Sequence, residues 1–205
     1  MPPPENNRPI LWIFAGPNGS GKSRFYEEVG VDTIGGSIRI INPDRLAQRI
    51  SDVEALELAV ANLEAVKRIE TWLDASIQAH QSVGVETVLS TSKYRRLVET
   101  AKATGFKVRL TYVLLDSADR NVARVSLRVD AGGHDVPEEK IRSRRDRSLA
   151  QLPWFLNAAE EAWIFDNSGA TPRLIGEKQD GEIKLDTAAL PEIVRAVQLA
   201  SEEQP

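Results

Sequence analysis

The stretch ILWIFAGPNGSGKSRF, residues 10–25, joins a short apolar run to a glycine-rich turn that ends in Gly-Lys-Ser. Residues 10–15 are apolar without interruption, a pattern that predicts a parallel strand buried on both faces. Residues 16–23 read G-P-N-G-S-G-K-S and match the P-loop pattern G-x-x-x-x-G-K-S/T. A helix is expected at residues 24–29, so strand, loop and helix follow in the order that the motif requires.

The turn predicts a nucleotide site. Glycines let backbone N–H groups surround a phosphate, and the helix N-terminus adds partial positive charge. We expect Lys22 to contact the β- and γ-phosphates of ATP and the Ser23 hydroxyl to bind Mg²⁺. The alternative is a chance glycine-rich turn, and the flanking strand and helix argue against it. The turn residues assigned to the nucleotide are Gly16, Pro17, Asn18, Gly19, Ser20, Gly21, Lys22 and Ser23.

Length and composition limit the class of protein. The chain has 205 residues and a mass of 22.7 kDa, and we expect one domain over residues 1–205 with disordered tails at 1–8 and 201–205. A net charge of −4 and a pI near 5.4 make nucleic acid an unlikely partner. Cysteine is absent, which fits a reducing compartment. Because no leader or membrane-spanning run is found, we expect a cytoplasmic protein that binds no membrane.

Strand and helix patterns alternate along the rest of the chain. Strands are predicted at 37–41, 83–89, 107–115 and 162–165. Helices are predicted at 45–50, 52–80, 93–104, 118–129, 138–149 and 191–199, with a small hairpin at 172–185. Repeated βα units predict an α/β fold of the P-loop kinase type, with a doubly wound, mainly parallel sheet flanked by helices. In such a sheet the site lies at the carboxyl ends of the strands.

Polar residues near these strand ends are the candidates for chemistry. Asp44, in N-P-D after the second strand, is expected to accept the proton of an acceptor hydroxyl, the alternative being a helix N-cap. Glu86 interrupts an apolar strand, where a carboxylate is costly to bury unless it is paired or functional. We expect Glu86 to bind substrate hydroxyls or the water shell of Mg²⁺. Ser90 closes that strand and either contacts the acceptor or caps the next helix.

An arginine-rich segment surrounds Gly132-Gly133. Four of the six residues from 142 to 147 are arginine, which is also the pattern of a solvated basic face or of a nucleic-acid patch. A Gly-Gly hinge in a P-loop protein favours instead a helical lid at about 130–148, whose arginines pair with phosphate oxygens and exclude water. The arginines expected to point inward are Arg128 and Arg144, followed by Arg124 and Arg145.

Together, these motifs resemble the zeta toxin family of P-loop kinases. The resemblance runs from residue 10 to about residue 169. It rests on the P-loop, N-P-D at 42–44, V-E-T at 85–87, G-G-H-D-V-P-E-E-K-I-R-S-R-R-D-R-S-L at 132–149 and F-D-N-S-G at 165–169. The G-G-H-x-V-P segment with its arginines is the most particular of these, since many families share the P-loop.

The resemblance implies a role for each matching residue. Lys22 and Ser23 would bind ATP–Mg²⁺, Asp44 would act as the general base and Glu86 would contact the acceptor. Arg128 and Arg144 would clamp phosphates. We add Arg124 and Asn167 to the nucleotide site, and Thr87, Ser90 and Arg145 to the substrate site. Family members studied as toxins phosphorylate the 3′-hydroxyl of UDP-N-acetylglucosamine, and an epsilon antitoxin blocks their ATP site, so an antitoxin partner is also implied.

One position departs from the toxin pattern. Toxin members follow the strand glutamate with Gly-Thr-x-Arg, and that arginine helps to hold the nucleotide sugar; here the position is Ser90. The expected reaction is therefore transfer of the ATP γ-phosphoryl group to a hydroxyl of UDP-N-acetylglucosamine or of another small molecule.

Two alternatives remain open. A polynucleotide kinase is disfavoured by the acidic pI and by the absence of aromatic residues among the arginines. An ATP-switched binding protein would need a clear Walker B aspartate, and Asp116 is more typical of a helix cap.

Overall fold

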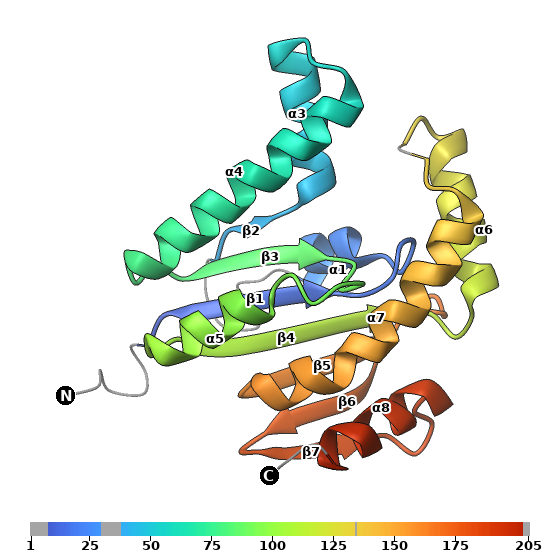
Figure 1. Ribbon diagram of the computed structural model, residues 1–205. Helices are drawn as coiled ribbons and strands as arrows, with labels where there is room; N and C mark the ends of the chain where they lie inside the picture. The colour runs from blue at the N-terminus through green and yellow to red at the C-terminus, as the bar shows by residue number, and fades with distance from the viewer. Residues whose placement is uncertain (1–7, 30–37, 134, 203–205) are drawn as a thin grey trace.

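The computed structural model describes residues 8–29, 38–133 and 135–202. These residues form one seven-stranded sheet in the order β2-β3-β1-β4-β5-β6-β7 (Figure 1). The parallel strands are β2 (Ile40–Ile41), β3 (Val83–Thr87), β1 (Ile10–Ala15), β4 (Lys107–Leu114) and β5 (Glu161–Asp166). The antiparallel hairpin is β6 (Arg173–Gln179) and β7 (Glu182–Leu185). The predicted mainly parallel α/β sheet is confirmed.

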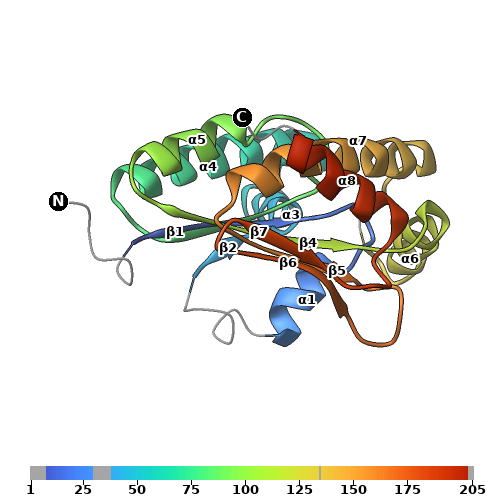
Figure 2. The same ribbon diagram turned by 90° about the horizontal axis from the view of Figure 1, so that it is seen from below.

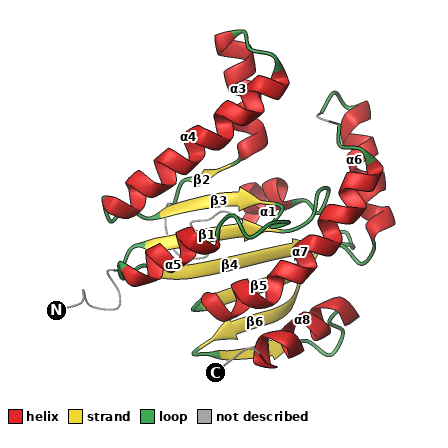
Figure 3. Cartoon of the chain, viewed as in Figure 1, coloured by secondary structure: helices red, strands yellow, loops and turns green. Residues whose placement is uncertain are grey.

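Helices cover both faces of the sheet. One face carries α4 (Leu58–Gln78), α5 (Arg95–Ala103), α7 (Glu138–Ala158) and α8 (Pro191–Glu202), and the other carries α1 (Lys22–Val29) (Figure 2). Two further helices, α3 (Pro43–Glu54) and α6 (Ala118–Asp130), lie beyond the carboxyl ends of the strands (Figure 3). Two helical pairs, α3–α4 and α6–α7, therefore flank the edge where the site was predicted. None of the described helices is long and apolar enough to cross a membrane.

Strand β1 explains why the apolar run in the sequence is continuous. Leu11, Ile13 and Ala15 pack in the core under α4, α5, α7 and α8. Trp12 and Phe14 point to the opposite face and pack with Phe25 of α1. Because successive side chains of a strand alternate between faces and both faces are covered, every position of β1 has to be apolar.

The segment predicted as one long helix at 52–80 is two helices. The first, α3, continues to Glu54, and Ala55 then adopts a left-handed conformation with φ of 54° that ends it. After this turn α4 begins at Leu58 and packs back along α3. The apolar spacing runs through the break, because both helices turn apolar residues toward the same small core, which contains Ala47, Ile50, Ala61 and Ala65.

The chain also differs from expectation at the end of α7, which was predicted to stop at 149 and continues to Ala158. Pro153 lies inside this extension, where it costs one backbone hydrogen bond. Leu152, Phe155 and Leu156 bury there against the sheet, so packing outweighs the unfavourable helix propensity.

Three residues of the expected tails, Arg8, Ser201 and Glu202, belong to the described part of the chain. The Arg8 guanidinium donates to both carboxylate oxygens of Glu160, and Ser201 and Glu202 belong to α8. The other residues of the two expected tails lie outside the described residues, as does residue 37, where the second strand was predicted to begin.

Ala55→Gly is expected to raise the free energy of unfolding by about 0.5–1 kcal/mol. Glycine removes the steric cost of the left-handed conformation, partly offset by its greater freedom in the unfolded chain. Urea unfolding measures the change. Ala150→Gly, in the exposed interior of α7, is the control and is expected to cost about 1 kcal/mol. Equal losses for the two variants would contradict the strain at Ala55.

Candidate active site

A cavity of about 980 Å³ opens at the carboxyl ends of β1 and β3, between α3 and α6. Its walls come from five parts of the chain: the P-loop with the start of α1, the start of α3, the end of β3, helix α6 with the turn after it, and the loop after β5. The lining residues that bear on the chemistry are Asn18, Gly19, Gly21, Lys22, Ser23, Asn42, Asp44, Glu86, Arg124, Arg128 and Asn167.

The P-loop packs too closely for side chains at its glycines. A Cβ on Gly16, whose φ is +145°, would lie 2.0 Å from the carbonyl oxygen of Val113. At Gly19 a Cβ would lie 2.6 Å from the carbonyl oxygen of Asn121, and at Gly21 it would lie 2.4 Å from Nδ2 of Asn167. The loop is therefore fixed from β4, α6 and the loop after β5, which fits a rigid cradle for phosphates.

Lys22 is the buried cation of the cavity. Its Nζ donates to the carbonyl oxygens of Gly16, at 2.7 Å, and Pro17, at 3.0 Å, and lies 4.0 Å from Oε1 of Glu86. Burial lowers the pKa of Lys22, and so does the charge of Arg128, while Glu86 and Asp44 raise it. Lys22 thus lies in the field of two acidic neighbours and one basic neighbour.

Ser23 and Glu86 meet at the rim of the P-loop. The Ser23 hydroxyl donates to Oε2 of Glu86 at 2.8 Å, and Glu86 is 9% exposed. Alternation along β3 turns Val83 and Val85 toward the large core and Glu86 toward the α1 side. Of the two roles expected for Glu86, this contact favours the Mg²⁺ water shell, because Ser23 is the expected metal ligand.

Asn42 joins this pair and was not singled out from the sequence. Its Nδ2 donates to Ser23 Oγ at 3.0 Å and to Glu86 Oε2 at 2.7 Å, and its Oδ1 accepts from the backbone N–H of Arg45 at 3.0 Å. Asn42 is therefore the N-cap of α3. Pro43 was the signal available in the sequence, since proline favours the first helical position and so places the cap one residue earlier.

Asp44 lines the cavity from the first turn of α3 and is exposed. The alternative that Asp44 caps the helix is wrong, because Asn42 makes the cap bond. Asp116 is likewise not a cap: Ser117 caps α6, and Asp116 pairs with Arg120 at 2.9 Å.

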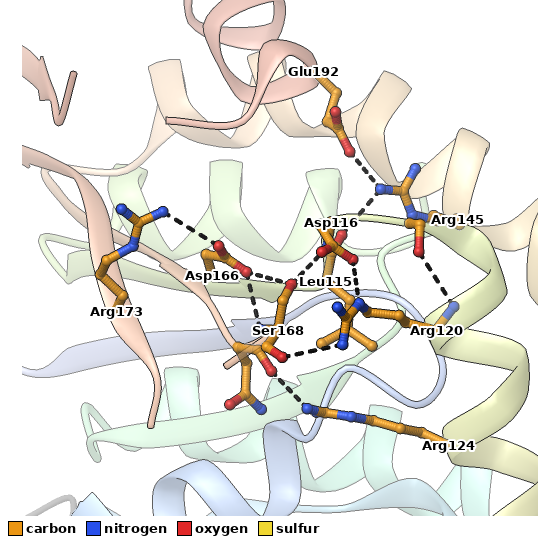
Figure 4. A network of polar contacts seen from close by, with 11 residues as sticks. Leu115, Asp116, Arg120, Arg124, Arg145, Asp166, Ser168, Arg173 and Glu192 are labelled. Atoms are coloured by element: carbon orange, nitrogen blue, oxygen red, sulfur yellow. Dashed lines mark hydrogen bonds and ion pairs between the residues drawn. The ribbon is translucent and has the colours of Figure 1, made fainter. Parts of the chain in front are cut away.

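Arg124 and Asn167, which were both predicted for the nucleotide site, line the cavity and are hydrogen-bonded to one another. Arg124, labelled in Figure 4, donates to the backbone carbonyl of Asn167 at 2.7 Å. The Asn167 side chain donates to the carbonyl of Ser20 at 2.8 Å. Asn121, inside α6, donates to the carbonyl of Asn18 at 2.6 Å. No sequence pattern identifies Asn121, since only the docking of α6 on the P-loop gives it this role.

The expected lid arginines do not act as one group. Arg128 lines the cavity together with Gly132 and Gly133. Arg144 is half-buried on α7 and is not among the described residues that line the cavity.

Arg145, assigned to the substrate from the sequence, is placed elsewhere by the structure. It is 8% exposed, donates to the carbonyl of Leu115 at 3.1 Å and forms an ion pair with Glu192 of α8 (Figure 4). Helix periodicity turns Arg145 to the same face as Ile141, Ser148 and Leu152, which are buried. Arg145 therefore fastens α7 to α8.

Thr87 and Ser90 lie near the cavity but outside the lining that the described residues form. The Thr87 hydroxyl accepts from the backbone N–H of Leu89 at 3.0 Å, which supports the turn after β3. Ser90 is half-buried, and the next helix begins at Arg95, so Ser90 does not cap it. Val88 is the residue of this segment that lines the cavity.

A P-loop at the end of a central parallel strand, with carboxylates on one side and arginines on the other, defines a nucleotide-binding protein of the kinase-like α/β class. The family model described as Zeta toxin matches residues 2–170. The chain belongs to the Zeta toxin family, whose kinases are phosphotransferases.

Solved structures share the fold at low sequence identity. A chain of the AvrRxo1-ORF1:-ORF2 complex, crystallised with ATP, is similar with a TM-score of 0.69 and 18% identity. The match covers 97% of this chain and 65% of that one, so the present chain spans just under two thirds of that protein. A chain from the PezAT chromosomal toxin–antitoxin system of Streptococcus pneumoniae has a TM-score of 0.57 and 14% identity, covering 96% of this chain and 85% of that one.

An uncharacterized protein of Haemophilus influenzae is similar in sequence. It is 28% identical over 146 residues, which cover 67% of this chain and 98% of the relative.

Gly16→Ala is expected to lower the free energy of unfolding of the nucleotide-free protein by at least about 2 kcal/mol. The new methyl group adds a positive-φ cost to an overlap with the backbone of Val113. Gly105→Ala is the matched control: its φ is +87°, no atom lies within 4 Å of the new Cβ, and about 1 kcal/mol is expected. Urea unfolding measures both, and equal losses would show that the P-loop can shift away from β4.

Proposed function

We propose that this protein is an ATP-dependent kinase that transfers the γ-phosphoryl group to a hydroxyl of a small molecule, with a nucleotide sugar such as UDP-N-acetylglucosamine as the acceptor. One observation carries the proposal: Lys22 and Ser23 of the P-loop share a cavity with two acidic residues from separate elements, Glu86 of β3 and Asp44 of α3. A second carboxylate across from the P-loop is what a kinase needs to take the proton of an acceptor hydroxyl.

The P-loop fits the phosphates of ATP. Its glycines have no room for a Cβ, and the buried Oγ of Ser20 and Oδ1 of Asn18 have no hydrogen-bond partner among the described residues. Lys22 would hold the β- and γ-phosphates, and Ser23 would hold Mg²⁺ with Glu86 behind it. When bound, Mg²⁺ supplies positive charge against the phosphate oxygens.

Asp44 has the position of the general base. It stands in the first turn of α3, on the cavity side, and its charge acts on Lys22. A carboxylate within hydrogen-bond reach of an alcohol orients the hydroxyl and takes its proton as the new O–P bond forms. Because Asn42 caps the helix, Asp44 has no capping role to fulfil.

Arg124 and Arg128 have the position of the phosphate clamp. They lie one turn apart on α6, so both face the cavity over the P-loop. The planar guanidinium pairs bidentately with phosphate oxygens and keeps its charge, which stabilises charge on the group in transit. One face of α6 carries Asn121, Arg124 and Arg128. The hydrogen bond from Asn121 to the P-loop therefore also fixes how far the two arginines stand from the P-loop.

The space beside Asp44 is where the acceptor would lie. Arg45 and Gln48 line it from α3, and Val88 lines it from the turn after β3. A cavity of about 980 Å³ is large enough for ATP and a second small molecule, since single-ligand pockets measure roughly 300–1,000 Å³. Membership of the Zeta toxin family supports the nucleotide sugar, and the toxin–antitoxin system of the Streptococcus neighbour supports an antitoxin partner.

Incubation of the protein with γ-labelled ATP and either UDP-N-acetylglucosamine or a metabolite extract tests the proposal by mass spectrometry. A labelled nucleotide sugar supports it in full. Labelled material of another small-molecule class corrects the acceptor, labelled oligonucleotide favours a polynucleotide kinase, and release of free phosphate alone rejects the kinase.

Asp44→Asn is expected to lower kcat by about 10²-fold or more, the scale of general-base catalysis, with ATP affinity and Tm nearly unchanged. The amide keeps the size of the side chain and cannot take the proton. Steady-state kinetics measures the change in kcat, and calorimetry measures the affinity for ATP.

Asp52→Asn, on the exposed face of the same helix, is the control and is expected to keep full activity. If Asp44→Asn keeps full transfer activity, Asp44 is not the base.

Arg128→Lys is expected to lower kcat by about two orders of magnitude, because lysine keeps the charge and loses the bidentate fork. Arg142→Lys is the matched control: Arg142 pairs with Asp119 and Glu138 on the surface, and its replacement is expected to leave kcat unchanged. A variant of Arg128 that changes only the KM for ATP would contradict a role in the transition state.

A further inference from the structure

The side chain of Asn42 contacts three elements: helix α1, which follows the P-loop, strand β3, and helix α3 on the acceptor side. It follows directly after β2, a strand of two residues, and directly precedes α3. Its side chain reaches Ser23 at the start of α1, Glu86 near the end of β3 and the first-turn N–H of Arg45 in α3. One amide thus contacts three elements that each carry a residue of the proposed site.

The chemistry of the three partners fixes the orientation of the amide. Of the two polar atoms of the amide, only Oδ1 can accept from the backbone N–H of Arg45, and only Nδ2 can donate to the Glu86 carboxylate. Aspartate would retain the cap and lose both donor bonds, placing a second carboxylate against Glu86. Serine could cap and would be too short to span to Glu86. The cap bond alone could be made by other residues. Only asparagine makes both the cap bond to Arg45 and the donor bond to Glu86.

We propose that Asn42 is a positioning residue for phosphoryl transfer: it holds Ser23 and Glu86, on the metal side, at a fixed distance from the helix turn that carries Asp44. The inference rests on the proposed function, because it assigns Asn42 its role through Asp44 and Ser23. Among the described residues, β2 is short and pairs with β3 at Ile40 with Gly84 and at Ile41 with Val85, with one more backbone bond from Gly84 to Arg39, so the strand by itself gives α3 a weak anchor. The Asn42 bonds supply the anchor at the point where the helix begins.

Geometry of this kind acts on the chemical step. A base and a metal ligand on different elements are productive only within a narrow range of separation, and a displacement of about 1 Å can cost about 10²-fold in rate. Binding of ATP through the P-loop does not depend on that separation. Loss of the Asn42 bonds should therefore lower kcat and leave the KM for ATP unchanged.

Asn42→Asp is the decisive variant, because it keeps the cap and breaks the donor bonds. We expect kcat to fall by about 10²-fold, with the KM for ATP within about threefold of wild type. Ser117→Asp places the same new carboxylate at the N-cap of α6, outside the cavity lining, and is expected to keep kcat. Asn42→Asp with kcat within about threefold of wild type overturns the proposal.

The same substitution in a Glu86→Gln protein distinguishes a positioning role of Asn42 from a general disturbance of the structure. In a Glu86→Gln protein, the new amide can donate to the carboxylate introduced by Asn42→Asp, so the pair is restored with its polarity reversed. We expect Asn42→Asp to cost less than about threefold in that background, a double-mutant coupling of more than tenfold. Equal losses in the two backgrounds overturn the proposal.

The ligand-free protein gives a readout that does not involve catalysis. Amide hydrogen exchange at Arg45 is expected to speed up more than about tenfold in Asn42→Ala and to stay within about threefold of wild type in Asn42→Asp, because aspartate still caps. Faster exchange in both variants would mean that Asn42→Asp unfolds the turn, which overturns the assignment of its kinetic effect to the lost donor bonds. If Asp44→Asn keeps full transfer, the proposed base fails; if Asp44→Asn loses transfer while Asn42→Asp keeps it, this inference alone fails.

Discussion

Strand β1 is hydrogen-bonded along both edges and covered on both faces, and this confinement determines what its carboxyl end can do. It pairs with β3 on one side and β4 on the other, so the chain can leave the sheet only between those two strands. The first residue of the exit, Gly16, donates its N–H to the carbonyl of Thr87 and leaves no space for a side chain beside Val113. The P-loop therefore has one geometry, and every other part of the site is placed relative to it.

The charges around the P-loop are balanced so that the cation stays available. Lys22 is buried, which is costly for a charge, and two carbonyl oxygens of its own loop accept hydrogen bonds from its ammonium group. Glu86 lies 4.0 Å away and accepts its hydrogen bonds from Ser23 and Asn42 instead. Glu86 thus offsets the positive charge of Lys22 without accepting a hydrogen bond from it. This arrangement suits a lysine that exchanges carbonyl oxygens for phosphate oxygens.

The arginines of the arginine-rich segment take three different positions, set by the helix that carries each and by the face on which it lies. Arg128 stands over the cavity, and Arg142 lies on the surface between Asp119 and Glu138. Arg145 turns into the interface with α8, where Glu192 pairs with it. Glu192 lies beyond residue 170, where the match to the family model ends, so the C-terminal helix of this chain supplies the partner that makes Arg145 structural.

The sequence by itself determined the central strand, the P-loop and the alternation of strands and helices, because local patterns and a contiguous motif specify each of them. It also predicted site positions for Lys22, Ser23, Asp44 and Glu86, and all four line the cavity. It also indicated an arginine cluster and predicted four inward-facing members, of which Arg124 and Arg128 line the cavity, while Arg144 and Arg145 are not among the described residues that line it. Only the tertiary structure decided that Asn42 joins Ser23 to Glu86, that Asn121 fastens α6 to the P-loop, and that Arg145 pairs with Glu192 of α8. The physical reason is common to all three: each role is a hydrogen bond or ion pair between residues 19 to 103 positions apart in the chain, and such partners are brought together by packing of the elements, which leaves no local pattern in the sequence.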